Sequence, residues 1–215
     1  MFASRNVIIL TILFAFYCLF SVNLHNGNSF AAEQPASNPA AVGEYLKLRL
    51  DYSKSEEYNP YNPEITDIRG QCIKLMDEEK FKEVIEKAKQ GLEKDKYNIQ
   101  LLICLAISYR KIGDIENADK YRKMWTGLVD SILTSGDGKS SETAFRVISV
   151  GEEYAVLNVL KLEVISQKLV TIQGSDFDIF ETVKSGRNEK ITLYFNVDIP
   201  FKWLVKKNEA GTVKK

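Results

Sequence analysis

The residues that could do chemistry in this chain are carboxylates, lysines and tyrosines. The single histidine, His25, lies in an N-terminal segment that we expect to be removed from the mature protein. Without it, the mature chain lacks the base of Ser-His-Asp and Cys-His sites, and it lacks any histidine ligand for zinc or iron. The sequence therefore predicts no metal and no cofactor, and no residue is assigned as catalytic.

Two pairs of neighbouring carboxylates keep an enzyme open as an alternative. One pair is Asp176 and Asp178, and the other is Glu152 and Glu153. Paired carboxylates can hydrolyse glycosides, which suggests a carboxylate-dependent hydrolase acting on glycan or peptidoglycan. Neighbouring carboxylates are also routine surface residues, and the sequence shows no cleft around these.

Three tyrosines in a proline-interrupted loop are the candidate partner-binding residues. Tyr52, Tyr58 and Tyr61 lie in the segment YSKSEEYNPYNP, residues 52–63. Tyrosine-rich loops suit recognition, because the ring gives a rigid amphipathic contact at low entropic cost. The other interpretation is that the rings fasten an N-terminal helix over the helical core.

The N-terminus has the layout of a signal peptide over residues 1–31. Arg5 precedes an apolar run from Val7 to Val22, and Ser29 and Ala31 fit the small-residue positions of a cleavage site. The run is shorter than the ~20 residues that span a bilayer. We therefore expect an exported protein, periplasmic or secreted, with no stable membrane span after cleavage. A retained anchor is the alternative.

Charge and cysteine usage narrow the range of partners. The chain has 29 Lys+Arg and 29 Asp+Glu, so no basic excess supports nucleic-acid binding. Cys72 and Cys104 could form a disulfide in an oxidising compartment. Buried free thiols are the other interpretation. The oligomeric state is left open by the sequence.

The first half of the mature chain carries helical periodicity. Residues 32–41 predict a flexible linker, and residues 42–133 predict a helical region with breaks near residues 76–80, 95–98 and 112–115. The stretch NIQLLICLAISYRKIGDIENADKY resembles a tetratricopeptide repeat, with Leu102 and Ala118 at its packing positions. The pattern indicates antiparallel helical hairpins.

The second half changes to a period of two. Residues 134–142 form a turn-rich boundary, residues 143–207 predict a small antiparallel β-α-β-β-β sheet region, and residues 208–215 predict a disordered tail. The clearest predicted strand runs from Lys190 to Ile199. The fold class expected from both halves is α+β.

The chain resembles a known family at three places. These are SGDGKSSETAFRVISVGEEYAVLNVLKL, QKLVTIQGSDFDIFETV, and the Tyr-Asn-Pro-Tyr of residues 58–61. They are similar to an exported bacterial family called domain of unknown function 4919. The resemblance implies location and fold, and it implies no activity and no functional residue.

The function that these patterns favour is non-enzymatic. We expect a protein-interaction or scaffold module of the bacterial cell envelope, with a protein as its partner. The alternatives are the carboxylate-dependent hydrolase and a small-ligand carrier. A carrier would need an apolar pocket between the helices and the sheet.

Overall fold

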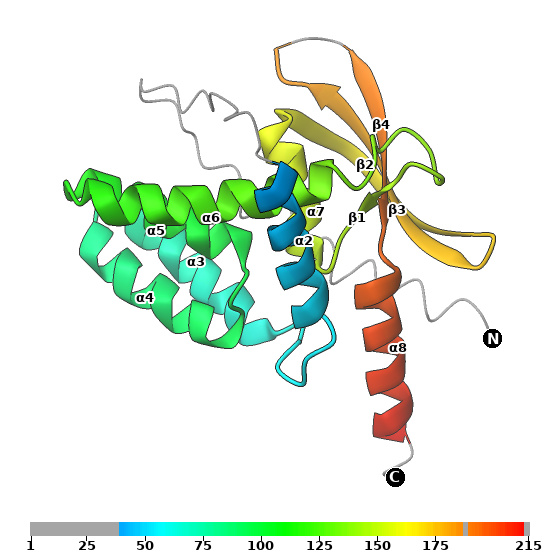
Figure 1. Ribbon diagram of the computed structural model, residues 1–215, viewed down its shortest axis with the longest axis horizontal. Helices are drawn as coiled ribbons and strands as arrows, with labels where there is room; N and C mark the ends of the chain where they lie inside the picture. The colour runs from blue at the N-terminus through cyan, green and yellow to red at the C-terminus, as the bar shows by residue number, and fades with distance from the viewer. Residues whose placement is uncertain (1–38, 187–188, 213–215) are drawn as a thin grey trace.

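The computed structural model describes residues 39–186 and 189–212 (Figure 1). The predicted signal peptide, residues 1–31, and most of the predicted linker lie outside the described residues. The described part is an α+β fold, with a helical layer followed by a four-stranded sheet. The helices are α2 (Pro39–Tyr52), α3 (Pro63–Asp77), α4 (Phe81–Lys94), α5 (Ile99–Lys111), α6 (Ile115–Leu133), α7 (Val150–Val159) and α8 (Asp198–Thr212). The strands are β1 (Phe145–Arg146), β2 (Leu162–Ile172), β3 (Ser175–Lys184) and β4 (Lys190–Asn196).

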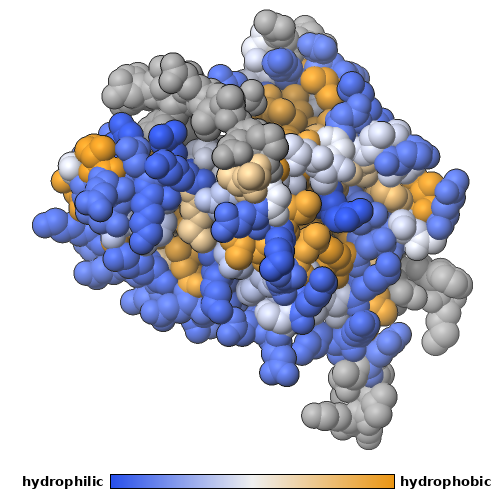
Figure 2. Space-filling model, in the orientation of Figure 1, coloured by the Kyte–Doolittle hydropathy of each residue, from blue (hydrophilic) through white to orange (hydrophobic). Residues whose placement is uncertain are grey.

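Helices α3 to α6 form two antiparallel hairpins, and their ends fall at the predicted breaks. Side-chain caps set where they begin: Asn62 accepts a hydrogen bond from the Glu64 N–H, and Asn98 accepts one from the Leu101 N–H. Figure 2 shows hydrophilic residues over the helical layer. The likeness to a tetratricopeptide repeat stays a prediction.

Helix α2 begins at Pro39, so the predicted linker ends before residue 41. Proline suits the first helical position because that residue's N–H would have no partner within the helix. The small, proline-containing composition hid this helix start.

The sheet is mixed, and the expectation of a purely antiparallel sheet was wrong. The strand order is β1-β4-β3-β2; β2, β3 and β4 are antiparallel neighbours, but β1 pairs with β4 in parallel. Parallel neighbours need a long crossover, which α7, β2 and β3 provide here. Alternating hydrophobicity reports which face a residue occupies, and it carries no information on strand direction.

Helix α8 is a second correction. The predicted last strand stops at Asn196, and α8 occupies residues 198–212, including part of the predicted disordered tail. The period-two pattern continues through Ile199 and hides the start of the helix. Asp198 joins this start to the sheet, because its Oδ1 accepts a hydrogen bond from the Asp176 N–H at 2.9 Å.

The helices and the sheet share one core. Leu128 and Ile132 of α6 pack with Val156 of α7 and with Phe180 and Phe195 of the sheet. A second apolar cluster lies within the α3–α6 hairpins, and Cys72 and Cys104 are free, buried thiols in it. Among the described residues, no helix is long and apolar enough to cross a bilayer.

Candidate functional site

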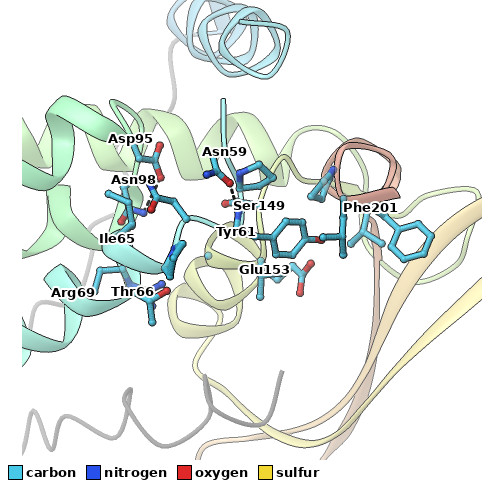
Figure 3. Close-up of a pocket in the computed structure, with 18 of the residues that line it drawn as sticks. Asn59, Tyr61, Ile65, Thr66, Arg69, Asp95, Asn98, Ser149, Glu153 and Phe201 are labelled. Atoms are coloured by element: carbon cyan, nitrogen blue, oxygen red, sulfur yellow. Dashed lines mark hydrogen bonds between the residues drawn. The ribbon is translucent and has the colours of Figure 1, made fainter. Parts of the chain in front are cut away.

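A cavity of about 360 Å³ lies between the helical layer and the sheet. Its walls come from the loop that follows α2, from α3, from the α4–α5 turn, and from the N-terminal ends of α7 and α8, with β2 and β3 (Figure 3). Its size is within the range of small-molecule sites. The apolar side chains of its wall include Ile65, Leu169, Val197, Phe201 and Leu204.

Glu153, in the first turn of α7, is the most unusual residue of this pocket. It lines the cavity, yet the exposed fraction of the residue is 0%. Among the described residues, neither of its carboxyl oxygens receives a hydrogen bond from a backbone N–H, a hydroxyl or an amide, and the group that it hydrogen-bonds is the Asp178 carboxyl. A buried acceptor without a donor costs about 1–3 kcal/mol, so this arrangement needs an explanation beyond packing.

The neighbouring Glu152 has a different task. Consecutive helical residues point about 100° apart, and Glu152 therefore faces α2 instead of the pocket. Its Oε1 and Oε2 accept hydrogen bonds from Arg49 Nε at 2.7 Å and Nη2 at 2.6 Å. Its Oε2 also accepts the Ile148 N–H at 2.8 Å. This buried ion pair holds α7 against α2, and it divides the predicted Glu152–Glu153 pair.

The second predicted pair is divided in the same way. Asp176 Oδ1 accepts a hydrogen bond from the Thr171 hydroxyl at 2.6 Å, at the β2–β3 turn. Asp178 is buried and lines the cavity. Its Oδ2 accepts a hydrogen bond from Gln167 Nε2 at 2.9 Å, and its Oδ1 is buried without a partner. One carboxylate of each predicted pair thus reaches the pocket.

Glu153 and Asp178 act on each other electrostatically. Burial raises the pKa of Glu153 well above its ordinary value, and the charge of Asp178 raises it further. Burial also raises the pKa of Asp178, from 3.8 to about 6. The two shifts therefore favour a shared proton that is carried by Glu153 and donated to Asp178, with the negative charge of the pair on Asp178.

Tyr61 is the member of the predicted tyrosine set that lines the pocket. Figure 3 shows its ring beside Glu153. Burial raises the pKa of Tyr61, and the neighbouring carboxyls of Glu153 and Asp178 raise it further, so the hydroxyl stays protonated. Tyr52 and Tyr58 are buried against each other with ring centroids 5.8 Å apart, and the Tyr58 hydroxyl donates to the Ile148 carbonyl. Partner binding by the three rings stays a prediction.

A second polar group lies across the pocket. Figure 3 shows Thr66, Arg69, Asp95 and Asn98 on the side away from Phe201. Asn98 Nδ2 donates to Asp95 Oδ2 at 2.9 Å. Burial raises the pKa of Asp95 and lowers the pKa of Arg69. The cavity wall therefore carries two separate polar groups, one around Arg69 and Asp95 and one around Glu153 and Asp178, with apolar residues beside each (Figure 3).

The glycine-rich segment between α6 and β1 is a structural turn. Asp137 Oδ1 accepts hydrogen bonds from the Thr143 hydroxyl at 2.6 Å and from the Lys139 N–H at 3.0 Å. Gly138 has a φ of +70°, and its carbonyl accepts the Tyr194 N–H at 2.8 Å. The segment thus ties the domain boundary to β4, as a turn that caps the strand. No group of three His, Cys, Asp or Glu residues in the described part of the chain is placed to hold a metal.

The structure divides both carboxylate pairs that the sequence suggests, and one member of each pair lines the pocket. The sequence groups residues that are close in the chain, whereas the pocket joins one residue from α7 with one from β3. The one local signal was the position of the two glutamates in a helical first turn, where only one of them can face the sheet.

Comparison with known proteins places the chain in one family. A family model with the description "Domain of unknown function (DUF4919)" matches residues 39–205. No curated protein and no solved structure matches the chain.

Proposed function

Because the chain belongs to the DUF4919 family, whose description names no activity, we propose a function from its geometry: the protein binds a small molecule in the pocket between its helices and its sheet. This is the carrier function that was an alternative from the sequence. The observation that carries it is Glu153, fully buried at the wall of a cavity of about 360 Å³, with no described donor outside the Glu153–Asp178 pair to either oxygen.

The buried Glu153 carboxyl at the cavity wall weakens the fold in the absence of a ligand. An unbonded buried carboxyl could be replaced by an apolar side chain at a gain in stability. Binding sites often keep such unfavourable groups because their contacts are completed by the ligand. The apolar wall then supplies burial for the body of the molecule.

Export to the periplasm or the exterior is part of the proposal. It rests on the pattern of residues 1–31, with Arg5 before the apolar run and Ala31 at the cleavage site. Binding of a protein partner by the helical hairpins, as a scaffold of the cell envelope, stays a prediction from the sequence.

A second candidate function is hydrolysis by the carboxyl pair. It is favoured by the divergent protonation of the two groups: Glu153 holds its proton as a general acid would, and Asp178, with its pKa of about 6, is ionised as a general base would be. Turnover of glycan or peptidoglycan fragments that disappears in both Glu153→Gln and Asp178→Asn would support it. Binding without turnover leaves the carrier function.

The test of the binding function is a thermal-shift screen against a library of small molecules. The wild type is compared with Leu169→Trp, which places an indole into the pocket. The matched control is Ile165→Trp on the same strand, where the side chain is 52% exposed and does not line the cavity. We expect compounds that stabilise the wild type and Ile165→Trp but not Leu169→Trp. A library that stabilises all three equally, or none, contradicts the proposal.

A further inference from the structure

The chemical class of the ligand can be inferred from the atoms that lack partners. Three buried oxygens at the sheet side of the pocket receive no hydrogen bond from a described residue outside the carboxyl pair: Oε1 and Oε2 of Glu153, and Oδ1 of Asp178. We propose that the pocket binds a small molecule in which a protonated amine, seated on the Glu153–Asp178 pair, is joined to an apolar body. The inference rests on the proposed binding function and narrows it.

Donor count supports an ammonium group. An ammonium carries three N–H donors and no acceptor. With the Glu153 proton donated to Asp178, the pair still offers the second Glu153 oxygen and the ionised Asp178 carboxylate as acceptors. A carboxylate or phosphate would bring only acceptors to acceptors. A hydroxyl would bring one donor, and would leave the remaining oxygens buried without partners.

Charge supports the same class. Asp178 carries the negative charge of the pair at neutral pH, and it is 5% exposed. A buried charge is unfavourable unless it is paired. Gln167 donates to Asp178 but brings no charge, and the pocket's one cationic side chain among the described residues, Arg69, lies across the cavity in Figure 3. A monocationic ligand would neutralise the pair.

The surrounding wall fits the rest of such a molecule. The ring of Tyr61 lies beside Glu153 (Figure 3), and an aromatic face attracts an organic cation. Leu169, Val197 and Phe201 add apolar surface from β2, the β4–α8 junction and α8. An alkyl or aryl body attached to the amine would be buried against them.

The experiment uses three probes that share one apolar body: phenylbutylamine, phenylbutanol and phenylbutyrate. Their affinities for the wild type are measured by titration calorimetry at neutral pH. We expect the amine to bind about tenfold or more tightly than the alcohol, because charge-assisted hydrogen bonds are the stronger ones. The acid should bind most weakly.

Two variants test whether the preference for the amine depends on the Glu153–Asp178 pair. Glu153→Gln combined with Asp178→Asn should reduce the amine's affinity about tenfold or more and leave that of the alcohol nearly unchanged. The matched control is Glu181→Gln, which removes an exposed carboxylate from the same strand as Asp178, and it should bind like the wild type.

The outcomes distinguish failure of the amine inference from failure of the proposed binding function. Equal binding of the three probes, or tighter binding of the acid, overturns the amine inference while the pocket remains a binding site. Binding of none of the three also overturns it, and the library screen with Leu169→Trp then decides the binding function separately. An amine preference that survives in the double variant would place the cation elsewhere and would also overturn the inference.

Discussion

Removal of Arg49 should destabilise the fold more than any surface substitution, because Arg49 joins the helical layer to the site-bearing helix. The side chains of Arg49 and Glu152 are 1% and 4% exposed. Besides its two bonds to Glu152, Arg49 donates from Nη1 to the Ser131 hydroxyl at 3.1 Å and from Nη2 to the Arg146 carbonyl at 2.9 Å. One guanidinium thus links α2 to α6, to β1 and to α7.

The magnitude follows from what the substitution leaves behind. In Arg49→Met the methionine fills much of the space, but Glu152 stays buried and keeps, among the described residues, one donor, the Ile148 N–H. Breaking a buried pair by removing one partner costs about 3–5 kcal/mol. Replacing both, in Arg49→Met with Glu152→Met, removes both buried charges and should recover most of that loss.

The assay is urea unfolding followed by circular dichroism, with the wild type, the single variant and the double variant compared. The control is Lys47→Met on the same helix, where the lysine side chain is 81% exposed and its ion pair with Asp51 is screened by solvent. Its effect should stay within about 0.5 kcal/mol. Two results would contradict the role of the Arg49–Glu152 pair. One is a loss of less than about 1 kcal/mol in the free energy of unfolding for Arg49→Met. The other is a double variant that is no more stable than the single one.

Three further predictions concern the turn, helix α3 and the pocket. Gly136→Ala should lower the free energy of unfolding by at least about 1–3 kcal/mol in urea melts, because a Cβ there would overlap the Thr143 carbonyl oxygen. Gly70→Ala, in the interior of α3 with no atom within 4 Å of its new Cβ, should instead raise it by about 0.5–1 kcal/mol. The pKa of Asp178 is raised from 3.8 to about 6 in the fold. Between these two pH values the folded state therefore keeps a proton that the unfolded state releases. The free energy of unfolding from this group falls as the pH rises through that range. Asp178→Asn, with Glu153 left as it is in the sequence, should remove up to about 3 kcal/mol of that pH dependence. Thermal melts of the variant that depend on pH as those of the wild type do would contradict this prediction.

The helical half follows from local signals. Asn62 and Asn98 cap helices where the periodicity predicts their starts, so the sequence suffices there. The sheet depends on pairing between distant segments, and neither the parallel β1–β4 pair nor the start of α8 at Asp198 has a local signature.

The site was only half predictable for the same reason. Sequence proximity suggested Glu152 with Glu153, and Asp176 with Asp178. The fold instead gives Glu152 to Arg49 and brings Glu153 to Asp178 across the pocket. The choice depends on which side of α7 faces the sheet, and that is set by tertiary packing.

The most direct test of ligand binding at Glu153 is the thermal-shift screen with Glu153→Gln measured beside the wild type. We expect compounds that raise the melting temperature of the wild type and fail to raise that of Glu153→Gln. We also expect the ligand-free variant to melt at or above the wild-type temperature at neutral pH, because a neutral amide replaces a buried carboxyl that receives no backbone or hydroxyl hydrogen bond. A variant that melts clearly lower while its compounds shift it as they shift the wild type would show that Glu153 serves the fold and not a ligand.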